Sequence, residues 1–233
     1  KKKKKDSTPI VIMAGGEGTR LLPFTNILPE TLIPVGGVPM IEHIILNFKE
    51  QNFDNFIISI NYKADLIKTF FSNKKKYKIN FILEKKKLGT AGSLKLLRKK
   101  LKTDFFISNC DTIYKTNYNE IINYHYKNKS DLTIVVAEKD YKIPYGVCEV
   151  NKDGVLKKIK EKPSFNLIIN TGLYLMSPKL LKLTSNKKGQ YDMTDLIQDA
   201  LQKNHKISTY LISDGSWNDI GQKEELLKIQ KNI

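Results

Sequence analysis

A short apolar run that ends in a cluster of glycines limits the fold of this chain more than any other feature. Residues 10–13 are continuously apolar, as in a strand buried on both faces, and glycines follow at 15, 16 and 18. Glycine lets the backbone turn sharply and bring its N–H groups close to an anion. Thr19 adds a hydroxyl and Arg20 a guanidinium, both suited to gripping a polyphosphate. The stretch therefore predicts a buried strand followed by a loop for the phosphates of a nucleotide.

The glycines alone fit an ordinary Gly-rich hairpin turn equally well. Two common nucleotide motifs are excluded. The dinucleotide fingerprint needs a third glycine where this chain has Leu21, and the P-loop needs Gly-Lys-Ser/Thr, which is absent.

Apolar runs of strand length alternate with helical periodicity as far as residue 128. We predict strands at 56–60, 79–83 and 105–108, and helices at 39–50, 64–71, 92–101 and 117–128. Such alternation indicates a parallel sheet, which binds ligands at the carboxyl ends of its strands. Because the glycine loop and Asp111 each follow a strand, both should face one crevice.

The second half of the chain has a different pattern. Strand-like runs at 133–137, 146–150, 155–159 and 168–176 are separated by turns, and a helix (194–203), a strand (207–212) and a closing helix (222–231) follow. We therefore predict an α/β fold: a Rossmann-like mixed, mainly parallel sheet flanked by helices, with an antiparallel extension. It would form one domain over residues 9–233, divided into halves at 9–130 and 131–233, after a linker tail at 1–8.

Charge and composition narrow the functional class. The net charge of +16 invites a nucleic-acid interpretation, but arginine, which reads base edges, occurs only as Arg20 and Arg98. The lysine runs 74–76 and 85–87 are interpreted as solvated surface, and no nucleic-acid partner is expected. There is no membrane-length apolar run and no signal-peptide pattern, and the two cysteines lack metal-ligand spacing. These features indicate a cytoplasmic protein without a membrane partner. The lysine-rich start without methionine indicates a piece of a longer protein.

The stretch 10–35 as a whole resembles the signature of sugar-1-phosphate nucleotidyltransferases. That signature reads Ala-Gly-Gly-x-Gly-Thr-Arg-Leu-x-Pro-x-Thr, a spacer, then Pro-Lys-x-Leu-x-Pro-Val, and one part differs: Glu30 replaces the lysine. The resemblance implies the nucleotidyltransferase fold, Mg²⁺ as cofactor, and transfer of a nucleotidyl group from an NTP to a sugar 1-phosphate.

Later motifs resemble the same family in the same order. Residues 88–93 match the nucleotide-base loop, although alone they would be a helix-capping turn. Asp111 and Asp219 resemble the two magnesium-binding aspartates, although a lone aspartate in a turn is usually a cap. The segments 145–147, 161–163 and 170–172 resemble the sugar-phosphate half of the site.

The resemblance implies three sets of site residues. The catalytic residues would be Arg20, Asp111, Lys162 and Asp219, with Glu30 at the position of the motif lysine, and the metal ligands would be Asp111 and Asp219. The nucleotide-binding residues would be Met13, Ala14, Gly15, Gly16, Glu17, Gly18, Thr19, Arg20, Asn61, Glu84, Leu88, Gly89 and Thr90. The sugar-phosphate-binding residues would be Tyr145, Gly146, Glu161, Lys162, Asn170 and Thr171.

Several alternatives stay open at this point. Gly92 makes the base loop most similar to that of guanylyltransferases, which favours GTP, with UTP or dTTP as the alternative. The chain is most similar to guanylyltransferases of bacterial amino-sugar and heptose pathways, which favours an amino sugar such as glucosamine 1-phosphate. Some similar proteins carry upstream regulatory domains of the cystathionine-synthase type, so such a fusion is expected. Because Glu30 places a carboxylate against the NTP phosphates, a second hypothesis is a binding module with impaired turnover. The third is a basic nucleic-acid-binding protein.

Overall fold

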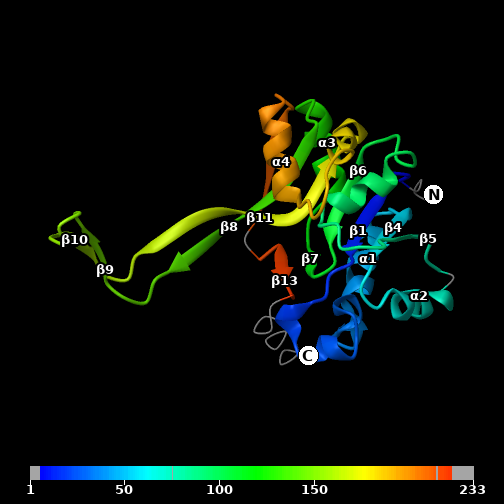
Figure 1. Ribbon diagram of the computed structural model, residues 1–233, viewed down its shortest axis with the longest axis horizontal. Coiled ribbons are helices and arrows are strands. Elements are labelled where there is room, and N and C mark those ends of the chain that lie inside the picture. Colours follow the sequence, from blue (N-terminus) through cyan, green and yellow to red (C-terminus); the bar gives the residue numbers. More distant parts are fainter. Residues whose placement is uncertain (1–5, 75, 214, 222–233) are drawn as a thin grey trace.

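A seven-stranded sheet forms the centre of the protein in a computed structural model that describes residues 6–74, 76–213 and 215–221 (Figure 1). The strand order is β12-β8-β11-β6-β1-β4-β5. The strands are β1 (Ile10–Ala14), β4 (Phe56–Ile60), β5 (Ile79–Leu83), β6 (Phe105–Asn109), β8 (Leu132–Lys142), β11 (Ser164–Met176) and β12 (Ile207–Ile212). β11 runs antiparallel to both its neighbours, and the other pairs are parallel. The predicted mixed, mainly parallel sheet is confirmed.

Both faces of the sheet are covered, as the continuous apolar run of β1 requires. Ile10 and Ile12 belong to the core cluster beneath α1 (Met40–Glu50), α2 (Ala64–Ser72) and α3 (Tyr118–Lys127). Val11 and Met13 belong to the cluster on the other face, with α4 (Met193–Gln202) and the 3₁₀ helices η4 (Gly92–Leu97) and η5 (Pro178–Thr184). Alternate side chains of one strand thus point into two cores.

Short elements complete the chain. Three further 3₁₀ helices follow β1: η1 (Thr19–Leu21), η2 (Phe24–Asn26) and η3 (Glu30–Leu32). Three small antiparallel pairs are β2 (Pro34–Val35) with β3 (Val38–Pro39), β7 (Thr112–Tyr114) with β13 (Trp217–Asp219), and β9 (Val147–Val150) with β10 (Leu156–Lys160). The strands β2, β3, β7 and β13 were not predicted from the sequence.

The predicted helix 92–101 is wrong. The segment is the 3₁₀ helix η4, which ends at Leu97. Its start is fixed by a tertiary contact, because the N–H groups of Ala91 and Gly92 both donate to the Tyr191 carbonyl, at 3.0 and 2.8 Å. A 3₁₀ turn still buries Leu94 and Leu97 at a spacing of three. The predicted helix 222–231 and linker residues 1–5 lie outside the described residues.

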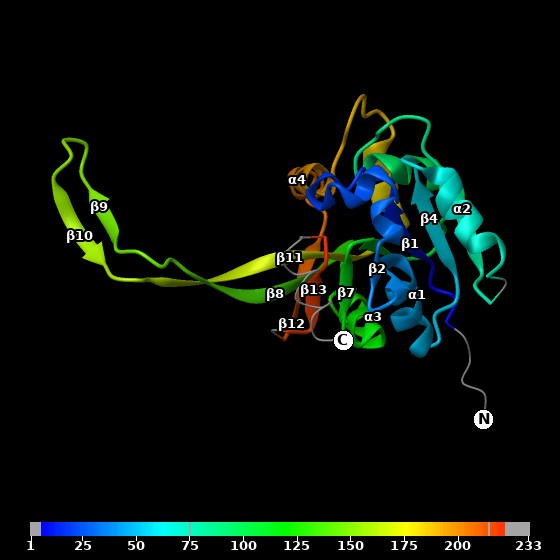
Figure 2. The ribbon, with the colours of Figure 1, turned by 90° about the horizontal axis from the view of Figure 1, so that it is seen from below.

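β8 and β11 are much longer than the predicted strands 133–137 and 168–176. Beyond the sheet they continue as a two-stranded arm, from the pair Ile169↔Ala137 to the pair Ser164↔Lys142, and β9 and β10 form its tip. Figures 1 and 2 show the arm projecting away from the body in both views. Residues 138–142 are Glu-Lys-Asp-Tyr-Lys, so cross-strand pairing and not burial makes them a strand. This arm is the predicted antiparallel extension.

No helix among the described residues is long and apolar enough to cross a membrane.

Candidate active site

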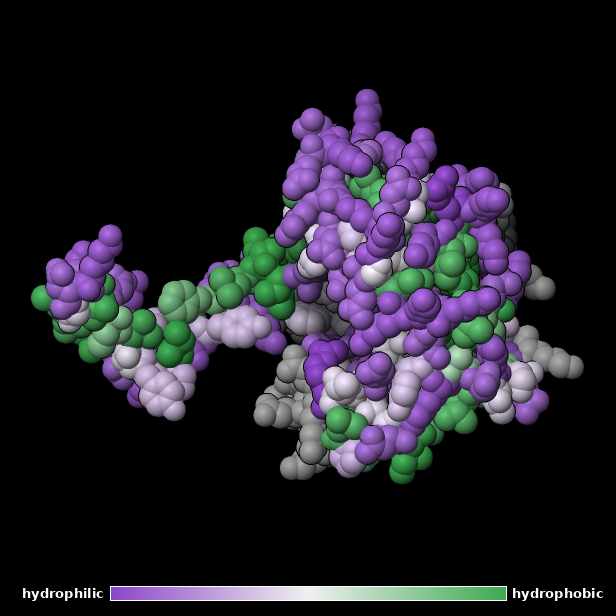
Figure 3. Space-filling view, viewed as in Figure 1, coloured by the Kyte–Doolittle hydropathy of each residue, from purple (hydrophilic) through white to green (hydrophobic). Residues whose placement is uncertain are grey.

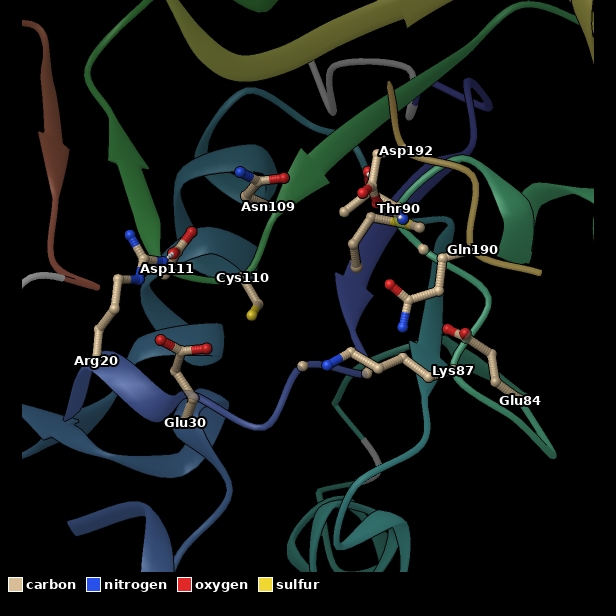
Figure 4. Close-up of a pocket in the computed structure, with 14 residues that line it drawn as sticks. Arg20, Glu30, Glu84, Lys87, Thr90, Asn109, Cys110, Asp111, Gln190 and Asp192 are labelled. Atoms are coloured by element: carbon tan, nitrogen blue, oxygen red, sulfur yellow. Dashed lines mark hydrogen bonds and ion pairs between the residues drawn. The ribbon is translucent and has the colours of Figure 1, made fainter. Parts of the chain in front are cut away.

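A pocket lies where β1 and β6 end, as the strand-and-loop pattern predicts (Figure 4). It is lined by Met13, Gly15, Gly16, Arg20, Glu30, Glu84, Lys87, Gly89, Thr90, Asn109, Cys110, Asp111, Gln190 and Asp192. Parallel strands place the residues that follow them at one edge of the sheet, which is why segments far apart in sequence meet here.

The glycine loop is held by close packing as well as by its turns. Gly18 has a φ of 63°, and a Cβ there would lie 2.7 Å from the Glu30 Cβ and the Thr25 Cγ2. A Cβ on Gly15 would lie 2.9 Å from the Glu84 Oε1. Larger residues at either position would push these carboxylate side chains aside, so the glycines shape the pocket.

Arg20, Asp111 and Asp219 meet at one end of the pocket. The Arg20 Nη2 lies 2.6 Å from the Asp111 Oδ2, and its Nη1 lies 4.0 Å from the Asp219 Oδ2. Asp219 reaches this position because β13 pairs with β7, and the Ile220 N–H donates to the Asp111 carbonyl at 2.9 Å. Burial and the charge of Asp219 raise the pKa of Asp111, and Arg20 opposes that rise. The structure thus brings together the two aspartates that the sequence analysis paired.

Glu30 lies inside the pocket beside these groups. Glu30 is 6% exposed, and its Oε1 has no hydrogen-bond partner among the described residues. Burial, and then the charge of Asp111, raises the pKa of Glu30 to about 7, although Arg20 acts in the opposite direction. The carboxylate at the motif-lysine position has therefore not turned away to the surface.

The donor set at this end suits Mg²⁺. Asp111 and Asp219 offer hard carboxylate oxygens around one guanidinium, and magnesium usually takes one or two carboxylates together with substrate phosphates and water. Within the described part of the chain, no three or more His, Cys, Asp or Glu residues form a ready-made metal cluster. A magnesium here would thus depend on oxygens from a bound ligand.

The opposite end of the pocket is stiffened by hydrogen bonds. The Glu84 Oε1 accepts from the Ser59 Oγ at 2.7 Å, and the Asn61 Nδ2 donates to the Glu84 carbonyl at 2.6 Å. Burial raises the pKa of Glu84. Glu84 therefore lines the pocket directly, whereas Asn61 holds it in place.

The predicted base loop is fastened to the segment before α4. The Asp192 Oδ1 accepts from the Thr90 N–H at 2.9 Å and from the Thr90 Oγ1 at 3.2 Å. Gly89 has a φ of 83°, and a Cβ there would lie 2.6 Å from the Tyr191 carbonyl oxygen. This contact brings Gln190 and Asp192 to the pocket wall.

Some lining residues were missed by the sequence analysis. Lys87 belongs to a run interpreted as solvated surface, yet it lines the pocket with its Nζ 3.8 Å from the Glu17 Oε1. Three consecutive lysines give no sign of which one faces the pocket. The one available signal was that Lys87 lies two residues before Gly89 of the predicted base loop. Gln190, Asp192, Asn109 and Cys110 were not among the predicted site residues. Burial raises the pKa of the Cys110 thiol well above its usual range, which argues against a nucleophilic role.

The structure separates the predicted sugar-phosphate-binding residues into two groups, one beside the pocket and one on the arm. Asn170 and Thr171 line a second depression that adjoins the pocket and shares Arg20, Asn109 and Asp111 with it. They lie at a break in the β11–β8 register, where the Thr171 Oγ1 donates to the Val135 carbonyl at 2.8 Å.

The other four of these residues, Tyr145, Gly146, Glu161 and Lys162, lie on the arm and line neither hollow. The structure thus does not place these four residues beside Asp111 within the chain, and their role stays a prediction. The reason for their position is the continuous β8–β11 ladder, which carries them away from the body.

Comparisons with known proteins agree with this geometry. The model of the nucleotidyl transferase family matches residues 10–233. The chain is similar to the bifunctional protein GlmU of Methanococcus aeolicus, with 30% identity over 96% of the chain and 54% of the relative. It is also similar to the mannose-1-phosphate guanyltransferase of Yarrowia lipolytica, with 32% identity over 93% of the chain and 61% of the relative. The chain thus spans between about half and three-fifths of these curated relatives.

A solved structure supports the same likeness. HddC from Yersinia pseudotuberculosis superposes with a TM-score of 0.75 at 28% identity, over 97% of this chain and 99% of that one. The same protein complexed with GMP-PN gives a TM-score of 0.74 at 27% identity, over 97% and 99%.

Proposed function

The chain belongs to the nucleotidyl transferase family, and from that premise we propose that it transfers a nucleotidyl group from an NTP to a sugar 1-phosphate. The products would be an NDP-sugar and pyrophosphate. The observation that carries the proposal is the meeting of Arg20, Asp111 and Asp219 next to a glycine loop at the end of a buried strand. A cation, two carboxylates and close-approach backbone are what a phosphoryl-type transfer needs.

The reaction would depend on alignment and charge. An oxygen of the sugar phosphate attacks the α-phosphorus in line, a new P–O bond forms, and the bond to the leaving pyrophosphate breaks. Because the nucleophile is already an anion, no general base is required. Arg20 and the loop amides would hold the pyrophosphate, so Arg20 must share its guanidinium between Asp111 and the ligand.

Mg²⁺ would be held by Asp111 and Asp219, where it would neutralise phosphate charge. Both carboxylates are positioned through the backbone. Asp111 follows β6, and Asp219 is fixed by the β7–β13 pairing and by the bond from the Ile220 N–H to the Asp111 carbonyl. Either side chain can therefore be replaced while these backbone bonds are kept.

GTP is the favoured nucleotide, with UTP or dTTP as the alternative. Support comes from Gly92 in the base loop, from the name of the Yarrowia guanyltransferase, and from the HddC complex with GMP-PN. An amino sugar such as glucosamine 1-phosphate is the proposed acceptor, and a reducing cytoplasm the proposed location.

Glu30 supports a second candidate function, a module that binds nucleotide or sugar nucleotide but turns over poorly. Its carboxylate is buried in the pocket near Asp111 and Asp219, where a triphosphate would add further negative charge. A pKa of about 7 leaves this side chain roughly half ionised at neutral pH.

The test is a pyrophosphate-release assay with each NTP and a panel of sugar 1-phosphates. The parent chain, Asp111→Asn and Glu30→Lys are assayed side by side. Turnover by the parent that disappears in Asp111→Asn supports the enzyme. Binding of GTP without turnover by the parent, with turnover restored in Glu30→Lys, supports the binding module. No turnover and no binding by any of the three contradicts both.

A further inference from the structure

Among the described residues, nothing packs on the arm formed by β8, β11 and the β9–β10 tip in a way that would account for its apolar surface. Exposed apolar side chains follow it from root to tip, and Figure 3 shows them as a band along the projection. Six of them are Tyr145, Val155, Leu156, Ile159, Leu167 and Ile168. A two-stranded ribbon is marginally stable alone in water, so a ribbon with this surface needs something to cover it.

The arm cannot fold back onto the pocket of its own chain without breaking the backbone pairing of β8 with β11. Pairing runs unbroken from Ile169↔Ala137 to Ser164↔Lys142, a reach of roughly 17–20 Å at about 3.3 Å per residue. The root is held as well, because the Tyr114 hydroxyl donates to the Thr171 carbonyl at 2.7 Å and Thr171 in turn donates to Val135. The direction of the arm is therefore built into the sheet.

The tip and the pocket have complementary charges. Residues 147–162 carry five lysines and three acidic residues. The pocket and its adjoining depression are lined, among the described residues, by five carboxylates and two cations. Lys162 also has a φ of 44°, an unusual conformation for a non-glycine residue, and it comes directly before Pro163. The turn thus presents a constrained cation at the end of β10.

The body offers an apolar surface beside the pocket. Leu22, Phe24, Ile27 and Leu28 are exposed in the segment that directly follows Arg20, which lines both hollows. An apolar ribbon with a basic tip would cover this segment and bring its tip to the acidic pocket.

We infer that the arm docks on a second copy of this chain, so that the second copy's Lys162 completes the site around Arg20, Asp111 and Asp219. Each copy has one arm and one pocket, and a twofold axis lets both arms dock at once in a closed dimer. The role of Lys162 toward the sugar phosphate rests on the proposed function, whereas the docking does not. The inference explains why Asn170 and Thr171 lie at the site while Glu161 and Lys162 do not.

The docking is tested by sedimentation of the full chain in the micromolar range. The chain should be a dimer, and Ile159→Glu or Ile168→Glu should raise the dissociation constant at least tenfold. Leu201→Glu is the matched control, because Leu201 is 56% exposed, against 61% for Ile159 and 66% for Ile168, but lies on α4. A monomeric parent, or a dimer that the control weakens as much as the arm variants do, overturns the inference whether or not the chain is an enzyme.

The completion of the site is tested with heterodimers of Asp111→Asn and Lys162→Ala chains, purified through two different tags. If arms are exchanged, one of the two sites in each heterodimer has both wild-type residues. The assay uses sugar 1-phosphate far below the KM of the Lys162→Ala variant, so that each single variant is nearly inactive, and about half of the parent turnover should then return. No gain over the single variants, with an active parent and a confirmed heterodimer, would show that Lys162 serves its own chain. An inactive parent contradicts the proposed function instead.

Discussion

Replacing Glu30 by glutamine should make the protein more stable at alkaline pH, because it removes a buried ionised group that lacks full compensation. The Glu30 pKa is raised from its usual 4.5 to about 7, chiefly by burial. At about 1.4 kcal/mol per pH unit, this difference corresponds to about 3 kcal/mol. Glutamine keeps the shape of the side chain and never ionises, so it should recover most of that free energy of unfolding.

The sign of the pH dependence follows from linkage. Below the unfolded pKa, Glu30 is protonated in both states, and the parent and Glu30→Gln should be equally stable. Between 4.5 and about 7 the unfolded chain has released this proton while the folded chain keeps it, so the parent loses stability as the pH rises. Above about 7 the full difference should be present.

The assay is urea unfolding of the two proteins at about pH 5 and about pH 8.5. Glu42→Gln is the matched control. Burial acts to raise the pKa of Glu42, but hydrogen bonds from Lys74 and Tyr77 outweigh it and lower that pKa. Glu42→Gln should therefore destabilise the protein at the higher pH. A Glu30→Gln variant with no gain at about pH 8.5 would refute the argument, since it would mean that the Glu30 carboxylate is hydrated.

Four further outcomes are expected from the same geometry. Glu30→Lys should raise kcat/KM by at least about tenfold, or about 1.4 kcal/mol, because it reverses the charge next to the triphosphate; equal kinetics at fixed ionic strength would remove the impaired-enzyme hypothesis. Asp111→Asn and Asp219→Asn should keep the melting temperature but nearly abolish turnover at saturating magnesium, and a near-parent rate would remove the role of the residue concerned. Lys162→Ala should raise the KM for sugar 1-phosphate much more than that for NTP, and an equal rise would argue against the division of the site. Gly89→Ala should destabilise the fold by more than about 1 kcal/mol in urea unfolding, because its φ of 83° and the Tyr191 carbonyl leave no room for a Cβ.

The sequence predicts the bounds of several strands well. The strands 56–60, 79–83 and 207–212 have their predicted bounds, because each is a short run rich in β-branched and aromatic residues, although β5 and β12 at the sheet edges are only partly buried. The prediction of a helix at 92–101 failed because hydrogen bonds to the Tyr191 carbonyl fix the start of the segment, despite its helical spacing of apolar residues. Residues 138–142 were not predicted as part of a strand, because they are mostly charged and are held by pairing across the arm and not by burial.

The site residues likewise fall into those that the sequence predicts and those that it does not. Arg20, Asp111 and Asp219 could be placed together because each lies in a motif that resembles the family pattern; a strand before Asp111 was predicted, whereas β13, which ends at Asp219, was not. The inward position of Lys87 and the approach of Gln190 depend on how distant loops pack, which a linear sequence does not record. The separation of Lys162 from the pocket could not be predicted either, since the sequence does not show the direction in which the paired strands β8 and β11 leave the sheet. The individual roles of these residues stay predictions.

Reversal of the proposed reaction tests the central claim most directly, because one experiment identifies the chemistry, the nucleotide and the sugar. The chain is incubated with Mg²⁺, labelled pyrophosphate and single NDP-sugars. We predict labelled GTP from a GDP-sugar, formed as pyrophosphate attacks the nucleotidyl phosphorus and the sugar 1-phosphate leaves, and no label with Asp111→Asn. Labelled UTP or dTTP would instead favour the alternative nucleotide. No labelled nucleotide from any NDP-sugar, with the parent or with Glu30→Lys, would contradict the account.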